Sequence, residues 1–393
     1  MKKVISLIIV LFISVSLLSL TMTAAKETGD FVCGIWKYSV YPDHVTITGV
    51  TTPVSGKIEI PAELDGHKID YVTINDFKKN DQITEAVIGE GIEYIASSIF
   101  TGCKNLKKVT LPSTLERISC DAFLNCISLT DINIPDSLIY VEPDLFSGCT
   151  ALKEIKLPET WSEVDMRLFK GCTSLETITI PSKVRSIASS AFEGCTSLKN
   201  VYLSDGLKEI KREAFKDCTS LKQITVPSTV EEIGNNAFEG CSSLTDITLC
   251  TGLKNIYQYA FKDCTSLREI KIPSTVKVID NYIFDGCTNL EKITLNEGVL
   301  GIGYSSFKNL TSLKSFTVPV SLDFEQKTIY PFDGCTGLTE VKFAKGRKVI
   351  PGGIFRIIDS NIKRIIIPDT VTSIEDNAFE FSKIENIAIP KSV

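Results

Sequence analysis

Apolar residues recur along the chain with a fixed period. A Phe stands at position 77 and then at every twenty-third residue as far as position 307, and three more continue the series with gaps of 25, 23 and 24 residues. The series consists of Phe77, Phe100, Phe123, Phe146, Phe169, Phe192, Phe215, Phe238, Phe261, Phe284, Phe307, Phe332, Phe355 and Phe379. Self-similarity at a fixed period of this length predicts a solenoid in which each repeat forms one coil.

The apolar positions inside one repeat predict its elements. Aliphatic residues stand eight and five positions before most of these Phe residues, and a Leu followed by two alternating aliphatic residues comes after them, as in Leu175, Ile178 and Ile180. Such alternation is typical of a half-buried strand. A Pro often follows this alternating segment. Because Pro has no N–H to donate to a strand ladder, it marks the end of the strand. We therefore expect a strand, a turn, a short return segment and a single helical turn at the sequence A-F-x-G-C in each coil.

The boundaries of the array follow from the same spacing. We expect about 13 or 14 stacked coils over residues 69–393, without a linker between Ile69 and Val393. The two-residue excess between Leu322 and Phe332 is expected to form a bulge. Residues 26–68 contain short alternating segments and are expected to form a β-rich capping segment. The last strand has only a short tail after it, so its open edge is expected to allow end-to-end self-association.

The first 25 residues have the features of a secretory signal peptide. Lys2 and Lys3 precede an apolar run from Val4 to Leu20, and small residues lead up to Ala25. The run is about 17 residues, at the short limit for crossing a bilayer, so an uncleaved anchor is the alternative. We expect a secreted or cell-surface protein with no membrane span after cleavage.

The repeated phrase A-F-x-G-C-x-S-L-x-x-I-x-I-P resembles the Treponema pallidum-type leucine-rich repeat, also called the BspA-like family. The segments 45–49 (VTITG), 58–61 (IEIP) and 64–66 (LDG) are similar to the lead-in of that family. The resemblance covers roughly residues 31–393. It implies a leucine-rich-repeat solenoid with a parallel sheet on the concave face and short turns and single helical turns on the convex face. It also implies an exported surface protein of a kind often involved in adhesion or host contact.

Composition and charge exclude several classes of function. Lys and Arg total 42 against 48 Asp and Glu, so there is no basic surplus for binding nucleic acid. The chain has only two histidines, His44 and His67, and it has no phosphate-binding loop, zinc-protease motif or calcium loop. We therefore expect a non-enzymatic protein without catalytic residues, cofactor or metal. A Cys33 thiol with His44 as its base is a remote alternative.

Ten of the thirteen cysteines stand three residues after a Phe of the series. The same slot holds Leu310 and Ile358 in other coils, so it is expected to be an apolar interior position in which the thiols are reduced and buried. Disulfides between adjacent coils are the alternative, because stacked positions lie about 5 Å apart. Cys120 lies outside this column and is expected to be exposed.

A second period lies over the first. From position 181 onward, strands followed by Pro alternate with strands that have a Gly three residues after their end, at Gly206, Gly252, Gly298 and Gly346. This alternation indicates duplication in units of two coils with two turn types; neutral drift is the alternative interpretation.

The outward residues of the strands form the candidate binding face. Ten residues after each Phe of the middle coils stand Lys156, Thr179, Tyr202, Thr225, Thr248 and Lys271. Solenoids use such columns as extended binding surfaces, although Thr also simply suits a pleated surface. We expect surface adhesion or binding of a protein partner, on a host or microbial surface, through this face, with a glycan as a second class of ligand. A structural or polysaccharide-associated envelope protein is the alternative function.

Overall fold

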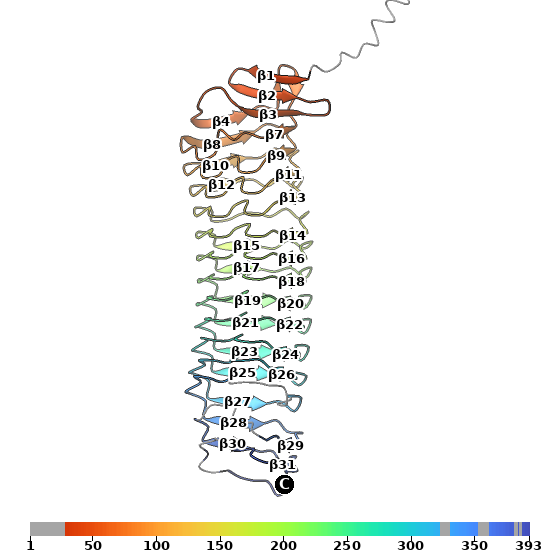
Figure 1. Cartoon of the computed structure of the whole chain (residues 1–393), viewed down its shortest axis with the longest axis vertical. Coiled ribbons are helices and arrows are strands. Elements are labelled where there is room, and N and C mark those ends of the chain that lie inside the picture. Colours follow the sequence, from red (N-terminus) through yellow and green to blue (C-terminus); the bar gives the residue numbers. More distant parts are fainter. Residues whose placement is uncertain (1–27, 323–330, 353–360, 381–383, 385–386) are drawn as a thin grey trace, which may run out of the picture.

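The chain winds into one column of stacked coils, with the N-terminal strands at one end and residue 393 at the other (Figure 1). This computed structural model describes residues 28–322, 331–352, 361–380, 384 and 387–393. Neighbouring coils pair in parallel with a shift of one repeat, as Thr177 does with Asn200 and Thr179 with Tyr202. The predicted solenoid with a 23-residue repeat is therefore confirmed.

The predicted strands form the first of two rows of parallel strands. Their alternating pattern points one set of side chains into the core and the other set outward, as in Gln223–Val226 with Ile224 and Val226 buried. We call the outward side the long-strand face. The row consists of β4 (Gly56–Ile60), β8 (Ile83–Ile88), β10 (Lys108–Thr110), β12 (Asp131–Ile132), β15 (Thr177–Thr179), β17 (Asn200–Tyr202), β19 (Gln223–Val226), β21 (Asp246–Leu249), β23 (Glu269–Ile272), β25 (Lys292–Leu295), β27 (Ser315–Val318), β28 (Glu340–Phe343) and β30 (Arg364–Ile366).

The return segments form the second row, whose outward side we call the short-strand face. Each member has two residues, of which the second points into the core in most coils, as Ile210 does. The row consists of β7 (Tyr71–Val72), β9 (Tyr94–Ile95), β11 (Arg117–Ile118), β13 (Tyr140–Val141), β14 (Glu163–Val164), β16 (Ser186–Ile187), β18 (Glu209–Ile210), β20 (Glu232–Ile233), β22 (Asn255–Ile256), β24 (Val278–Ile279), β26 (Gly301–Ile302), β29 (Val349–Ile350) and β31 (Ser373–Ile374).

The N-terminal end differs from the coils. Strands β1 (Gly29–Cys33), β2 (Trp36–Val40) and β3 (Val45–Val50) pair in antiparallel fashion, and β3 then pairs in parallel with β7. This joins the antiparallel layers directly to the short-strand row. Strand β4 pairs with β8 and begins the long-strand row, while β5 (Glu63–Leu64) and β6 (His67–Lys68) form a small hairpin beside it.

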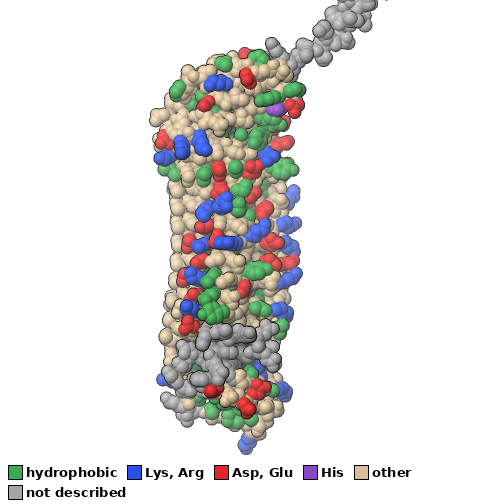
Figure 2. Space-filling view, in the orientation of Figure 1, with side chains coloured by type: hydrophobic (Ala, Val, Ile, Leu, Met, Phe, Trp, Pro, Cys, Tyr) green, Lys and Arg blue, Asp and Glu red, His purple; other side chains and the backbone are tan. Residues whose placement is uncertain are grey.

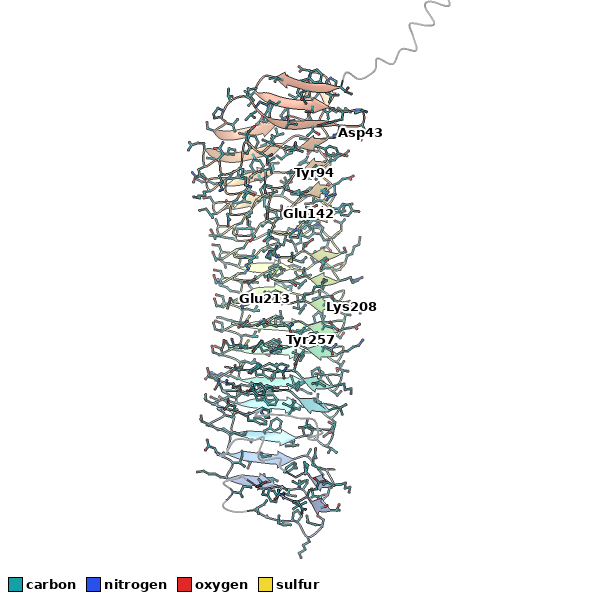
Figure 3. The ribbon with its side chains drawn as sticks, in the orientation of Figure 1. Asp43, Tyr94, Glu142, Lys208, Glu213 and Tyr257 are labelled. Carbon is teal, nitrogen blue, oxygen red and sulfur yellow. The ribbon has the colours of Figure 1, made fainter. Side chains whose placement is uncertain are left out.

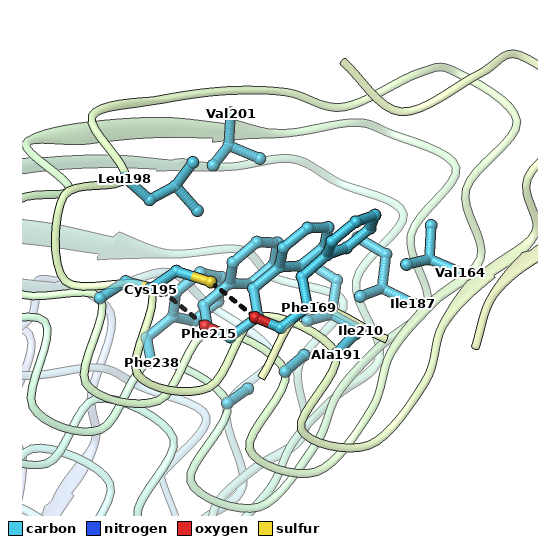
Figure 4. Close-up of a cluster of buried hydrophobic side chains, with 14 of the residues drawn as sticks. Val164, Phe169, Ile187, Ala191, Cys195, Leu198, Val201, Ile210, Phe215 and Phe238 are labelled. Carbon is cyan, nitrogen blue, oxygen red and sulfur yellow. Dashed lines mark hydrogen bonds between the residues drawn. The ribbon is translucent and has the colours of Figure 1, made fainter. Parts of the chain in front are cut away.

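The Phe residues of the series stack as one ladder along the core. All eleven from Phe77 to Phe307 are fully buried. Their rings are nearly parallel, with centroids 5.3 Å apart between Phe192 and Phe215 and 5.4 Å apart between Phe215 and Phe238 (Figure 4). Aliphatic residues of both rows surround them, so each coil buries its apolar residues mainly against the coils before and after it.

The single helical turn expected at A-F-x-G-C does not form in the described coils, which have consecutive turns there. The residues two before and two after the Phe have positive φ, for example 58° at Ser190 and 72° at Gly194, whereas a right-handed helix needs negative φ. The N–H groups of Ser190, Phe192 and Gly194 instead donate to carbonyls of the next coil, with N···O distances of 2.8–2.9 Å. The segment is thus a third ladder between coils.

The ten cysteines of the repeat are buried, as expected, and all thirteen in the chain carry free thiols. Each thiol of the column donates to the carbonyl of the Phe in the preceding coil. Cys195 Sγ lies 3.1 Å from Phe169 O (Figure 4), and Cys218 Sγ lies 3.2 Å from Phe192 O. The thiols therefore satisfy buried backbone acceptors, and the core interpretation is confirmed over the disulfide alternative.

Native alkylation should separate these thiols from the others. Burial raises the pKa of the Cys149, Cys172 and Cys218 thiols well above the usual range, so they stay protonated and unreactive at neutral pH. We expect iodoacetamide to label the partly exposed Cys120 first and the column only after denaturation. Peptide mass spectrometry before and after denaturation checks this, and a Cys195–Cys218 disulfide in the native protein would contradict it.

Three of the four alternating glycines lie against the backbone of the preceding coil, whereas a Cβ at Gly346 would meet only the Val320 side chain at 3.4 Å. A Cβ at Gly206 would lie 2.1 Å from Ser182 O, one at Gly252 would lie 1.7 Å from Ser228 O, and one at Gly298 would lie 2.6 Å from Ser274 O. These contacts are shorter than any Cβ tolerates, so the glycine turns fit closely under the Pro-Ser turns of the coils before them. The alternation therefore has a steric role, which favours the interpretation of two turn types.

Two expectations lie outside the described residues: the signal peptide at residues 1–25, and the bulge between Leu322 and Phe332, which falls on residues 323–330. A search of the described ranges finds no helix with the length and apolar character needed to cross a membrane.

Candidate binding sites

The six residues predicted as a binding face all lie exposed on the long-strand side. Thr179, Tyr202, Thr225, Thr248 and Lys271 belong to β15, β17, β19, β21 and β23, whereas Lys156 lies between β12 and β15 in a coil without a strand in this row. Thr179 pairs with Tyr202, and Thr225 pairs with Thr248, so these side chains project in register from neighbouring coils. Tyr202 is 58% exposed and is the one aromatic residue among the six.

Shallow hollows flank this column. One of about 370 Å³ lies beside Tyr202, Thr225 and Thr248, and another of about 580 Å³ lies beside Lys156 and Thr179. Neighbouring charges neutralise one another across coils; Lys199 Nζ lies 3.0 Å from a Glu176 carboxylate oxygen, and this hydrogen bond lowers the pKa of Glu176. The face is therefore polar, extended and weakly charged.

A second site lies on the short-strand face near the N-terminus, where it forms a groove of about 600 Å³. We call it the aromatic groove and define it by Tyr41, His44, Tyr71, Tyr94, Arg117 and Tyr140. The Tyr41 ring stacks on His44 with centroids 4.5 Å apart, and His44 lies 4.8 Å from Tyr71. Tyr71 meets Tyr94 edge to face at 5.5 Å. The rings therefore form a row along the column axis.

Polar groups complete the groove. The Arg117 guanidinium lies 5.8 Å from the centroid of the Tyr94 ring and also donates to Glu142, a hydrogen bond that lowers the pKa of that carboxyl. Glu93 and Glu116 line the groove with exposed side chains. Tyr94, Glu142 and Asp43 mark this side of the column in Figure 3.

The rings come from one position of the repeat, and sequence reasoning missed them. Tyr71, Tyr94, Arg117 and Tyr140 each stand six residues before a Phe of the series and are aligned in register from β7 to β13. The recurrence of Tyr at this position, one repeat apart, was a signal in the sequence that could have identified them. Tyr41 and His44 come from the loop between β2 and β3, outside the repeat, so the period gave no sign of their place in the row.

The structure gives no support to a Cys33–His44 catalytic pair. His44 Nδ1 lies 2.8 Å from Asp43 and its ring stacks on Tyr41. Cys33 instead interacts with Asp65, and this hydrogen bond raises the pKa of the thiol, which is the opposite of what a thiolate nucleophile needs. Over the described part of the chain, no group of three or more His, Cys, Asp and Glu side chains is arranged to hold a metal ion.

Comparison with known families agrees with the repeat geometry. Overlapping segments 70–199, 116–241, 162–290, 208–331 and 325–393 match the family described as the BspA type leucine rich repeat region. The chain belongs to the BspA-type leucine-rich repeat family. The resemblance seen in the sequence is thereby confirmed. No curated protein matches the chain.

Solved structures of three bacterial proteins share this fold. A leucine-rich repeat protein from Bacteroides ovatus is 21% identical with a TM-score of 0.64, covering 93% of this chain and 96% of its own. A leucine-rich cell surface protein from Faecalibacterium prausnitzii is 25% identical with a TM-score of 0.51, covering 93% and 95%. The pneumococcal vaccine antigen PcpA is 20% identical with a TM-score of 0.56, covering 94% and 100%.

Proposed function

We propose that this BspA-type protein is an exported, non-enzymatic binding protein that contacts a protein partner, on a host or microbial surface, through the long-strand face. The supporting observation is the column of six exposed residues from Lys156 to Lys271, of which five project from consecutive strands of the row. A partner would touch several coils at once, and repeat proteins bind extended surfaces in this way. The description of a similar structure as a cell surface protein fits this location.

For an exported protein of this kind we propose three segments with separate roles. Residues 1–25 act as the signal peptide, residues 26–68 cover the first coil, and residues 69–393 form the binding column. The pairing of β3 with β7 and of β4 with β8 supports the covering role, because both rows of strands are met by the N-terminal layers.

Simultaneous replacement of Tyr202 and Lys271 by alanine should weaken partner binding about tenfold, because a ring and a cation at a contact each supply a large share of its energy. Both side chains are exposed, so the melting temperature should stay unchanged. Binding is measured on a panel of immobilised host matrix proteins and should also weaken with salt. Arg212→Ala, on the exposed turn side, is the matched control. The proposal fails if the control loses binding and the double variant keeps it.

The alternative is a structural or polysaccharide-associated envelope protein. In that case the protein should sediment with purified cell-wall glycan, and the matrix-protein panel should show no binding that depends on Tyr202.

A further inference from the structure

The aromatic groove is built from residues that the repeat itself does not require. In later coils the position six before the Phe holds Glu163, Ser186, Glu209 and Glu232, and these coils fold with the same short strands. There the column carries ion pairs and hydrogen bonds, such as Glu163 with Lys211 Nζ at 2.9 Å and Glu232 with Asn255 at 3.1 Å. The N-terminal coils thus present tyrosines where the same fold accepts charged residues.

These rings remain open to solvent. Tyr41 is 43% exposed and Tyr140 is 62% exposed, while Tyr71 and Tyr94 are half-buried. In Figure 2, green side chains gather at the upper right edge of the column, and charged side chains replace them further down that edge. A contiguous group of exposed rings with polar groups at its margin is the usual composition of a ligand site.

The polar margin restricts the ligand. Glu93 and Glu116 are exposed beside the rings, and within the described ranges neither carboxylate takes part in an ion pair, whereas Arg117 is already paired with Glu142. Two free carboxylates accept hydrogen bonds from hydroxyl or ammonium groups and repel phosphate, sulfate and carboxylate. Nucleic acids and acidic polymers are therefore disfavoured.

The shape of the groove favours a linear ligand along the column axis. Neighbouring coils place the Tyr71 and Tyr94 ring centroids 5.5 Å apart, and Tyr140 stands two coils beyond Tyr94 with Arg117 between them, so the groove extends over several coils. The flat faces of tyrosine rings pack against the C–H faces of sugars while their hydroxyls reach polar groups. A peptide that adds a strand would need a free sheet edge, whereas the groove lies on the face of paired strands β7, β9, β11 and β13.

We propose that the aromatic groove binds a linear glycan whose units are uncharged or carry amino groups. The exposed Tyr140 ring, one coil past Arg117, packs flat against a sugar face, while Tyr71 and Tyr94, which meet edge to face, form the floor of the groove. Glu93 and Glu116 accept hydrogen bonds from hydroxyl or amino groups. This site is separate from the long-strand face, so it goes beyond the function proposed above.

The test is calorimetric titration of the full chain with soluble oligomers of glucose, N-acetylglucosamine, glucosamine and galacturonic acid. We expect binding of at least one uncharged or amino-bearing oligomer and none of the acidic galacturonate. Tyr140→Ala and Tyr94→Ala should each weaken binding about tenfold, and Tyr94→Phe should retain it, since the ring is kept. Tyr304→Ala, which removes a 44% exposed tyrosine of a later coil that belongs to neither candidate site, is the matched control and should bind as the unaltered protein does.

Two further variants separate binding from folding. Tyr140 is mostly exposed, so Tyr140→Ala should leave the melting temperature unchanged even if Tyr94→Ala lowers it. Glu93→Gln with Glu116→Gln keeps the size of both side chains and should weaken binding of the glucosamine oligomer more than that of the uncharged oligomers. Absence of binding to all three non-acidic oligomers, preference for galacturonate, or equal binding by Tyr140→Ala would each overturn the proposal. Loss of matrix-protein binding in the Tyr202 variant with glycan binding intact would show that the two sites act separately.

Discussion

Replacement of Phe215 by alanine is expected to lower the free energy of unfolding by about 3–5 kcal/mol, the usual range for deleting a fully buried Phe side chain. Phe215 stacks between Phe192 and Phe238 with centroid distances of 5.3 and 5.4 Å, so both ring contacts are lost together. The turns on either side hold their backbone through bonds to the neighbouring coils, which limits collapse around the cavity.

The effect should concentrate in the adjacent coils. Each coil touches mainly its neighbours, and long arrays need not unfold as one unit, so amide hydrogen exchange resolved along the chain is the suitable measurement. Exchange should accelerate most between about residues 192 and 238 and least near the ends of the column. Thr225→Ala, an exposed change in the same region, is the control. Uniform acceleration along the whole chain would contradict this nearest-neighbour picture.

Replacement of Gly252 by alanine is expected to destabilise the protein by about 2 kcal/mol or more, because overpacking forces backbone shifts. The new Cβ would lie 1.7 Å from Ser228 O, which is backbone and cannot rotate away. The strain should separate the coil of Gly252 from the coil of Ser228.

Gly301→Ala is the matched control for this substitution. A Cβ at Gly301 would meet only the Val278 side chain at 4.0 Å, an ordinary contact, although the residue is equally part of a coil. Thermal unfolding of both variants measures the difference: Gly252→Ala should lower the melting temperature by several degrees, and Gly301→Ala should leave it nearly unchanged. Equal melting temperatures would show that the glycine turns relax freely.

The periodic part of the fold could be predicted because it rests on burial. The Phe ladder, the alternating strand and the buried thiols all follow from apolar residues that recur at one spacing, and a repeat can bury them only by stacking. The prediction of a single helical turn was wrong. Most residues with positive φ in this segment are not glycine, so no glycine pattern pointed to their left-handed conformation. Ser190, Glu213 and Tyr259 stand at that position with φ of 57–60°, and only the ladder to the next coil accounts for their conformation.

The candidate sites show a similar division. The outward position of Tyr202 follows directly from strand alternation, and the structure places it exposed. The aromatic groove depends partly on Tyr41 and His44, which reach the row through antiparallel pairing of β2 and β3 and parallel pairing of β3 with β7. The second of these pairings joins residues far apart in the sequence. The local pattern of apolar and polar residues therefore does not indicate that β3 pairs with β7.

The ladder of turns around the Phe residues gives every coil a direction. The N–H groups of Ser190, Phe192 and Gly194 reach forward to the next coil, and the carbonyls of the same segment receive from the coil behind, as Arg167 N does with Ser189 O. A donor side and an acceptor side are therefore repeated at each junction of this ladder, so a coil cannot be inserted in reverse. Genetic duplication or loss of whole 23-residue units, or of 46-residue pairs where the glycine turns alternate, preserves every junction type. The length of the protein is thus free to change during evolution by recombination between its own repeats, while its stacking chemistry stays the same.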